Sequence, residues 1–243
     1  MCNIDCNRRC SRGLWLAATL LGSLPAIAAA RDTPLEAALH YFTRFDPAGA
    51  VAALEQARPP ALSVETRRAV LAALPPEGEV RNLSAGQRRK LAGIDRVLAL
   101  HRPEGTYEIK VVHAVQASLG LHARTVVLIS ERALDLLDAE EIQALAAHEI
   151  GHDYFWAEYR DARRQRDGAR LQKLELLCDG IAVITLRRVG LDPARLISGL
   201  ERLSWYNAET LGAARNEDDY PGLDVRKKLV RALVRWLSGG TPD

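Results

Sequence analysis

The sequence predicts an α+β protein that is mostly helical, with a small antiparallel sheet near its middle and a helical extension at its N-terminus. Alanine, leucine and arginine are frequent, and aromatic residues make up only 5% of the 243 residues, a composition that favours helix. Apolar residues recur at helical spacing over most of the chain. Two short runs of alternating apolar and polar residues interrupt this pattern and predict strands. The length allows one large domain with a small addition.

The first thirty residues predict a secretory signal. Three arginines precede an apolar stretch from Leu14 to Leu24, and Ala28–Ala30 offers a cleavage site of small residues. The apolar stretch is short and contains Gly22 and Pro25, which argues against a helix that spans a membrane. We therefore expect residues 1–30 to be removed and the protein to be periplasmic or secreted. The alternative is that this segment stays uncleaved and anchors the protein to a membrane.

The charge of the remaining chain is balanced. The predicted signal holds three of the 33 basic residues and one of the 31 acidic residues, so the rest has a formal net charge of zero. Nothing in this charge points to nucleic acid as a partner. Cys178 is the only cysteine that follows the signal. A single cysteine in an exported protein is expected to be a buried, unreactive thiol.

The first half of the chain predicts short helices followed by two strands. Apolar spacing and two proline pairs predict two or three short helices over residues 33–76. They form an N-terminal helical extension, residues 31–80, in which we recognise no chemistry. One amphipathic helix is expected over residues 84–99. Alternating runs over residues 107–115 and 125–129 predict two strands that pair as an antiparallel sheet.

The second half of the chain predicts helices throughout. Asp138 followed by Glu141 is typical of a capping box at the start of a helix. The charged run over residues 160–170 is expected to be a solvated helix end and loop. A second long helix is expected over residues 170–189, where a glycine and then a proline end it. A final amphipathic helix is expected over residues 225–237.

Residues 148–152 read His-Glu-Ile-Gly-His. Histidines four residues apart lie on one face of an α-helix, one turn apart, so the imidazoles of His148 and His152 can reach one metal ion. Glu149 is rotated from that face by about 100°, which places its carboxylate beside the metal, where it can take a proton from bound water. Such a motif also arises by chance, and paired histidines on a helix are otherwise surface or core residues.

A second feature supports a metal site. Glu175 and Asp179 lie four residues apart on a strongly apolar helix, and a buried carboxylate pair is costly unless its charges are compensated. A divalent cation and an imidazole N–H would compensate them. We therefore expect Glu175 to be the third protein ligand, and Asp179 to accept a hydrogen bond from a ligating histidine and orient it. The alternative is that both carboxylates lie on an exposed side of the helix and pair with nearby arginines.

Three protein ligands leave one coordination position open, which is typical of a catalytic zinc site rather than a structural one. A water molecule bound there has its pKa lowered toward about 7. Glu149 would accept its proton as the water attacks a carbonyl carbon, and would then pass the proton to the leaving amine. The expected cofactor is therefore Zn²⁺, and the expected reaction is hydrolysis of an amide bond without a covalent intermediate.

The stretch from Val126 to Arg231 resembles peptidase family M forty-eight, which includes the HtpX heat-shock protease and the CAAX prenyl proteases. Three segments carry the resemblance: VVLISERALDLLDAEEIQALAAHEIGHDYF, ELLCDGIAVITLRRVGLDP and DDYPGLDVRKKLVRAL. The resemblance implies a zincin-like (gluzincin) metalloprotease domain over residues 81–243 and a protein or peptide substrate. We expect no membrane spans in the catalytic region, which favours a soluble, exported member acting in periplasmic protein quality control or processing.

Two positions depart from the family pattern. Tyr220 stands before Pro221, where many relatives have histidine. It is expected either to donate a hydrogen bond to the oxyanion and so take part in catalysis, or to pack against the helix end. His113 stands where relatives often have asparagine, in the strand expected to line the cleft, and it either contacts substrate or is purely structural. The segment between His152 and Glu175 is short, which predicts an open groove for extended polypeptide.

Two alternatives to a peptidase stay open on the sequence. One is a zinc-stabilised binding or chaperone-like module without turnover, although every residue expected for the metal and its base is present. The other is a zinc amidase acting on a cell-wall or small-molecule substrate, because the same residues would support that reaction. We expect no nucleic acid as a partner, and a membrane only if the N-terminal segment is uncleaved.

Overall fold

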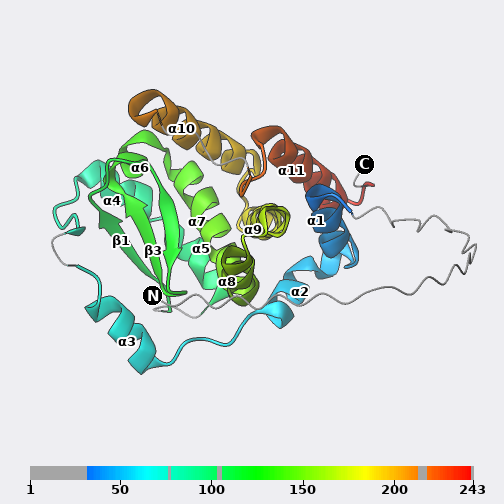
Figure 1. Ribbon diagram of the computed structural model, residues 1–243, viewed down its shortest axis with the longest axis horizontal. Helices are drawn as coiled ribbons and strands as arrows, with labels where there is room; N and C mark the ends of the chain where they lie inside the picture. Colours follow the sequence, from blue (N-terminus) through cyan, green and yellow to red (C-terminus); the bar gives the residue numbers. More distant parts are fainter. Residues whose placement is uncertain (1–31, 76–77, 103–105, 213–217, 242–243) are drawn as a thin grey trace, which may run out of the picture. The chain divides into compact units, whose positions relative to one another are not determined.

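The computed structural model of the protein describes residues 32–75, 78–102, 106–212 and 218–241 (Figure 1). The predicted signal over residues 1–30 lies outside the described residues. Residues from Asp32 onward form one compact unit. The described part is mostly helical with a small three-stranded sheet, so the predicted α+β class is confirmed. Among the helices described, none has both the length and the apolar character needed to cross a membrane.

The N-terminal helices are α1 (Pro34–Thr43), the 3-10 helix η1 (Pro47–Gly49), α2 (Ala50–Ala57), α3 (Val64–Ala72), α4 (Ala85–Leu91) and α5 (Ile94–His101). The strands are β1 (Glu108–Val112), β2 (Leu119–His122) and β3 (Val126–Ser130). The helices after the sheet are α6 (Glu131–Leu136), α7 (Ala139–Tyr154), α8 (Trp156–Gln165), α9 (Gly168–Arg188), α10 (Ala194–Leu211) and α11 (Leu223–Leu237). The predicted short helices before residue 76 and both long helices are thus present.

The sheet is mixed, and the prediction of an antiparallel sheet is wrong. Its strand order is β1-β3-β2, with β1 parallel and β2 antiparallel to β3. The two predicted strands are β1 and β3, and β2 lies in the segment that we expected to connect them. The turn after β2 explains this order, since Ala123 and Arg124 have φ of 46° and 61°. Two residues with positive φ close a tight hairpin, which fixes β2 beside β3.

The expected helix over residues 84–99 is two helices, α4 and α5, which meet at Gly93. A Cβ atom at Gly93 would lie 2.4 Å from Nε2 of Gln143 on α7, so a larger residue would require the Gln143 side chain to move. The charged run over residues 160–170 is also mostly helical, because α8 continues to Gln165. There Arg166 adopts the left-handed conformation, with φ of 54°, and the chain turns into α9.

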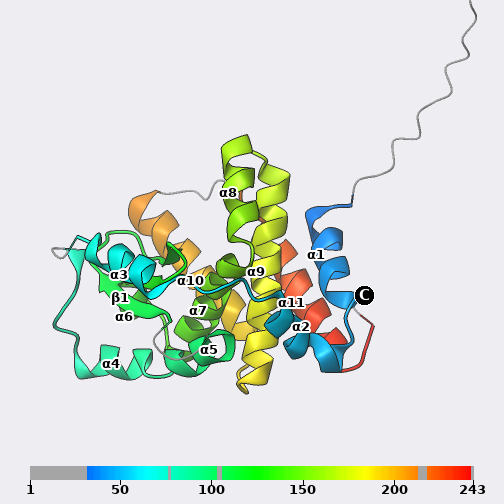
Figure 2. The same cartoon turned by 90° about the horizontal axis from the view of Figure 1, so that it is seen from below.

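The core is arranged around two long helices, α7 and α9. Figure 1 shows α7 between the sheet and α9, with α1 and α11 on the opposite side of α9. Helix α8 lies alongside the amino-terminal half of α9 (Figure 2). Helix α1, in the predicted extension, is part of this core: Phe42 is 1% exposed and packs against Gly180 of α9. Both central helices are therefore buried on most sides, which explains their continuous apolar character.

Candidate metal centre

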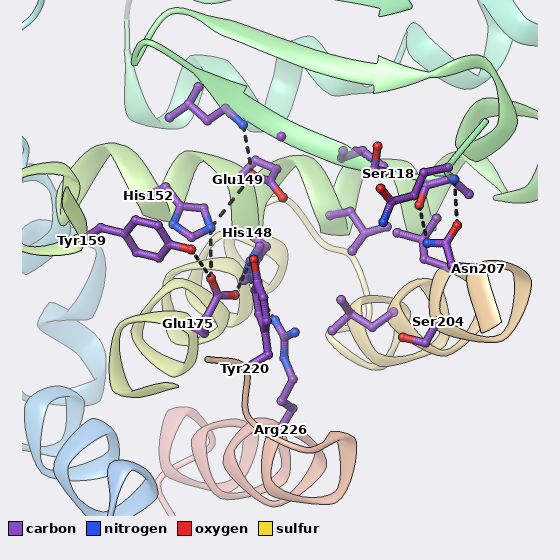
Figure 3. Close-up of a pocket in the computed structure, with 18 of the residues that line it drawn as sticks. Ser118, His148, Glu149, His152, Tyr159, Glu175, Ser204, Asn207, Tyr220 and Arg226 are labelled. Atoms are coloured by element: carbon purple, nitrogen blue, oxygen red, sulfur yellow. Dashed lines mark hydrogen bonds and ion pairs between the residues drawn. The ribbon is translucent and has the colours of Figure 1, made fainter. Parts of the chain in front are cut away.

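His148 and His152 on α7 and Glu175 on α9 converge, and their ligand atoms all lie within 4.8 Å of one another (Figure 3). Nε2 of His148 lies 3.4 Å from Oε2 of Glu175, and Nε2 of His152 lies 3.8 Å from Oε1. Tetrahedral coordination with bonds of about 2.0–2.1 Å separates neighbouring ligand atoms by about 3.3 Å. These three residues, which we call the ligand group, could therefore hold a metal ion with little movement of their side chains.

The local sequence explains how the two helices bring these ligands together. Helix α7 begins at the predicted capping box, in which Asp138 and Glu141 each accept a hydrogen bond from the other's backbone N–H. Gly151 lies where α7 meets α9, and a Cβ atom there would be only 2.7 Å from Cα of Cys178. Glycine thus lets the two backbones approach closely, and Glu175, one turn before Cys178, comes within reach of both histidines.

Asp179 forms a hydrogen bond with the imidazole nitrogen of His148 that faces away from Glu175. Oδ1 of Asp179 lies 2.9 Å from Nδ1 of His148, and Asp179 is completely buried. An Nδ1–H that donates to this carboxylate leaves Nε2 free to face Glu175. Glu175 is only 3% exposed, so neither carboxylate lies on an exposed side of α9, as the alternative interpretation required.

Arg226 completes this arrangement, and we did not single it out from the sequence. Its Nε donates to Oδ2 of Asp179 at 2.7 Å and its Nη2 donates to Oδ1 at 2.5 Å. The side chain is 1% exposed. A signal was present in the sequence, because Arg226 stands at the start of the apolar face formed by Leu229, Val230 and Leu233 of α11. A charged residue on such a face requires a buried partner of opposite charge.

The buried side chains of the ligand group, Asp179 and Arg226 stabilise one another's charged forms. Burial favours neutral His148, but hydrogen bonds to Asp179 and Glu175 outweigh burial and raise the pKa of His148 to about 9. Burial alone would raise the pKa of Glu175, but the nearby charges of His152 and His148 lower this pKa below its usual range. The pKa of Asp179 is likewise lowered, because Arg226 outweighs burial. Both carboxylates are therefore ionised at neutral pH, which is the form that binds a cation, whereas His148 carries a proton on Nε2 that metal binding would displace.

Glu149 lies beside the ligand group without belonging to it. Its Oε2 is 4.0 Å from Nε2 of His152. The same oxygen accepts a hydrogen bond from the backbone N–H of Leu121 at 3.1 Å. Glu149 thus connects the helix that carries the histidines to the edge strand β2.

Two tyrosines lie near the ligand group. Tyr159 of α8 donates its hydroxyl to Oε1 of Glu175 at 3.2 Å, and its ring centroid is 4.9 Å from that of His152. Tyr159 was not singled out from the sequence because it precedes a charged run that we assigned to the solvent. Tyr220 lines the same cavity, and its hydroxyl accepts a hydrogen bond from Nη2 of Arg163 at 3.5 Å.

Two other residues considered in the sequence lie elsewhere or are inert. His113 follows β1, is 59% exposed and pairs with Glu131 at 3.0 Å. The expectation that its strand lines the cleft is wrong, because β2 takes that place and His113 does not line the cavity. Cys178 is fully buried, as predicted, with Sγ 3.5 Å from Nδ1 of His152. Burial, the largest influence, raises the pKa of its thiol, so it is unreactive.

A cavity of about 780 Å³ opens over the ligand group (Figure 3). Residues 119–121 of β2, with Ser118 just before them, form one edge of it, and α7 forms its floor. At one end the lining is uncharged, with Leu200 and Leu203 of α10 beside the polar Ser204 and Asn207 of the same helix. At the other end it is formed by α8. The size and the convergence of polar groups are typical of a site for a ligand or substrate.

Comparison of the chain with protein-family models, with curated proteins and with solved structures finds no match. The class of site is therefore defined by its own geometry: a buried group of two histidines and one glutamate, beside a further glutamate, at the base of an open cavity. This group could hold a metal ion.

Proposed function

We propose that the protein is a zinc-dependent endopeptidase. The observation that carries the proposal is the convergence of His148, His152 and Glu175 within 4.8 Å, beside Glu149 and beneath a cavity edged by β2. Two imidazoles and one carboxylate favour zinc over magnesium or calcium, which prefer oxygen ligands throughout. Three protein ligands also leave a position for water. The resemblance to peptidase family M forty-eight supports the same interpretation.

The residues of the chain have separate roles in this reaction. Bound zinc would polarise the carbonyl of the substrate and would lower the pKa of a bound water molecule toward neutral pH. Glu149 accepts the proton of the attacking water and returns it to the leaving amine. Asp179 keeps the proton of His148 on Nδ1, so that Nε2 remains a ligand atom. Arg226 fixes Asp179 in turn, and Tyr220 is placed in the cavity to donate to the oxyanion.

The edge strand β2 supports an extended polypeptide as the substrate. Ser118 accepts a hydrogen bond from Ser130 N–H, and His122 accepts one from Thr125 N–H. Backbone polar groups alternate in direction along an antiparallel strand, so those of Leu119 and Leu121 point away from β3. The Leu121 N–H already donates to Glu149, so a substrate strand can pair with the outward groups of Leu119 and with the Leu121 carbonyl, and lie across the ligand group. Together with the predicted signal, this substrate class leads us to propose a role in periplasmic protein quality control or processing.

The proposal is tested by metal content and cleavage together. Purified mature protein should contain stoichiometric zinc and cleave casein or an unfolded outer-membrane protein. Glu175→Ala should lose the metal, because it removes the only carboxylate ligand. Glu149→Gln should keep the zinc and lose cleavage, because it removes the base alone.

Three results would contradict the proposal. Equal zinc in the protein and in Glu175→Ala would reject the ligand set. Unchanged biological function in Glu149→Gln would favour the binding or chaperone-like module. Hydrolysis of peptidoglycan without cleavage of proteins, tested side by side, would identify an amidase instead of a peptidase.

A further inference from the structure

One face of α8 lines the cavity at the end away from α10. The face consists of Trp156, Tyr159, Arg160 and Arg163, and we call it the α8 face. The four positions are spaced by three, one and three residues, so they form a single stripe along the helix. The stripe contacts the ligand group at Tyr159, which donates to Glu175, and both arginines follow Tyr159 along the helix. The two arginines therefore extend the site in one direction from the metal ligands.

Within the described part of the chain, the arginines of the α8 face have no carboxylate partner. Arg160 makes no hydrogen bond or ion pair with any described residue. The guanidinium of Arg163 lies 5.4 Å from the Tyr159 ring centroid and donates to the Tyr220 hydroxyl. By contrast, Arg164, on another side of the same helix, pairs with Asp161 at 3.1 Å.

The rest of the cavity lining does not neutralise these two charges. Among the described residues, Glu149 and Glu175 are the acidic groups that line the cavity. Both are occupied at the ligand group, Glu175 as an expected ligand and Glu149 with the Leu121 N–H. Asp161 of α8 is turned away, where it pairs with Arg164 and Arg170. The α8 end of the cavity is thus cationic, whereas the α10 residues that line the other end are uncharged.

The direction of strand β2 determines which part of a bound polypeptide lies at each end of the cavity. Near its start, Ala117 exchanges two hydrogen bonds of 2.9 Å with Asn207 of α10. Just beyond its end, Arg124 lies 2.5 Å from Asp153, close to the start of α8. A polypeptide that pairs antiparallel to β2 therefore has its amino-terminal part over α8 and its carboxyl-terminal part over α10.

We infer that the α8 face selects substrates with an acidic residue on the amino-terminal side of the cleaved bond. This inference rests on the proposed peptidase function and specifies its substrate class. Along α8, Arg160 directly follows Tyr159, and Arg163 lies about one helical turn beyond Tyr159, a turn being about 5.4 Å. An extended chain advances about 3.3 Å per residue, so the acidic residue stands about two or three residues before the cleaved bond. A carboxylate there can accept hydrogen bonds from both guanidinium groups.

The test measures binding without turnover, using zinc-loaded Glu149→Gln protein. Three fluorescein-labelled peptides share one sequence around a central apolar residue. The first has two glutamates on the amino-terminal side, the second has glutamines there, and the third has the glutamates on the carboxyl-terminal side. Fluorescence anisotropy should give a Kd about tenfold lower for the first peptide, which corresponds to about 1.4 kcal/mol. The difference should shrink as salt is raised, because screening weakens exposed charge pairs.

Variants of α8 assign the preference to the α8 face. The double variant Arg160→Gln/Arg163→Gln should abolish the tenfold difference in Kd. Arg160→Gln alone should only reduce that difference, and it leaves Arg163 in contact with Tyr159 and Tyr220. Arg164→Gln is the matched control and should retain it, because this side chain does not line the cavity. Thermal unfolding and zinc content should be unchanged in all of these variants.

The possible results separate this inference from the proposed function. Equal binding of the three peptides, tighter binding of the third, or a preference that survives the double substitution would overturn the inference. Cleavage of proteins by the unmodified enzyme without any acidic preference would overturn the inference alone. An acidic preference in binding, with no cleavage by the unmodified enzyme, would keep the binding site and reject the peptidase.

Discussion

Arg226 of α11 and Asp179 of α9 form a buried pair with two hydrogen bonds, of 2.7 and 2.5 Å. The residues are 47 positions apart in the chain, and neither side chain is more than 1% exposed. Asp179 also bonds to Nδ1 of His148, and Nη2 of Arg226 lies 3.3 Å from the same nitrogen, so the last helix is connected to the ligand group both through this carboxylate and directly. The orientation of His148 therefore depends on α11 as well as on α7 and α9.

Removing the arginine should strongly destabilise the protein. Arg226→Met leaves Asp179 ionised, buried and without its charged partner, which costs about 3–5 kcal/mol. The free energy of unfolding, measured with urea, should fall by that amount. Arg231→Met is the matched control: Arg231 is exposed on the same helix, and its loss should change stability by less than about 0.5 kcal/mol. Similar losses in both variants would contradict the importance of the buried pair.

The ligand group was predictable because each of the sequence signals for it lies within a single helix. The spacing of His148 and His152 follows from the period of one helix, and the cost of burying Glu175 and Asp179 could be judged from the apolar residues around them. The structure places all four where these arguments expected. The start of α7 was predictable for the same reason, since the capping box from Asp138 is confined to four residues.

What could not be predicted depends on contacts between distant segments. Strand β2 is only four residues long, and the turn after it is Ala123-Arg124, which lacks the glycine or asparagine that normally indicates such a turn. The parallel pairing of β1 with β3 follows from that unrecognised strand. Tyr159 and Arg226 acquire their roles from partners on other helices, and no spacing within their own helices specifies those partners.

The two tyrosines near the ligand group should be separable by experiment. Tyr159→Phe removes a hydrogen bond to Glu175, and loss of such an outer contact lowers metal affinity by about 10-fold or more. Tyr220→Phe should leave zinc affinity unchanged and reduce kcat by about 10²–10³-fold, as expected for a lost oxyanion donor. Competition with a chelator measures the first and steady-state kinetics the second. An unchanged kcat in Tyr220→Phe would assign that residue to packing alone.

Gly180 should not tolerate a side chain, because α1 packs against it. A Cβ atom at Gly180 would lie 2.0 Å from Cε2 of Phe42, and that ring is 1% exposed with little room to move. Gly180→Ala should therefore destabilise the protein by about 1–3 kcal/mol, despite the higher helix propensity of alanine. Combining it with Phe42→Leu, which shortens the obstructing side chain, should cost less than the sum of the single changes. Additive effects in urea unfolding would contradict this contact.

His101 should make stability depend on pH, independently of the metal ligands. It is 1% exposed, with Nδ1 2.8 Å from the Tyr154 hydroxyl and Nε2 2.9 Å from Oγ1 of Thr185. Because Thr185 donates its own hydroxyl proton to Ile181 O, its oxygen accepts from Nε2–H, and Nδ1 accepts from Tyr154. Burial, together with the charge of Arg58, lowers the pKa of His101 to about 3, so the native imidazole is neutral.

The unfolded chain binds a proton at His101 below pH of about 6.5, whereas the folded protein does not until pH of about 3. The stability that neutral His101 allows is therefore complete above about pH 6.5 and is lost as the pH falls from there toward 3. Between pH 7 and pH 5 this group alone should lower the free energy of unfolding by about 2 kcal/mol. His101→Gln cannot be protonated and should lose about 2 kcal/mol less over the same interval, whatever its stability at pH 7. Metal-free protein with chelator present is the sample for both measurements, and parallel pH profiles in the two proteins would show that His101 is not held neutral by the fold.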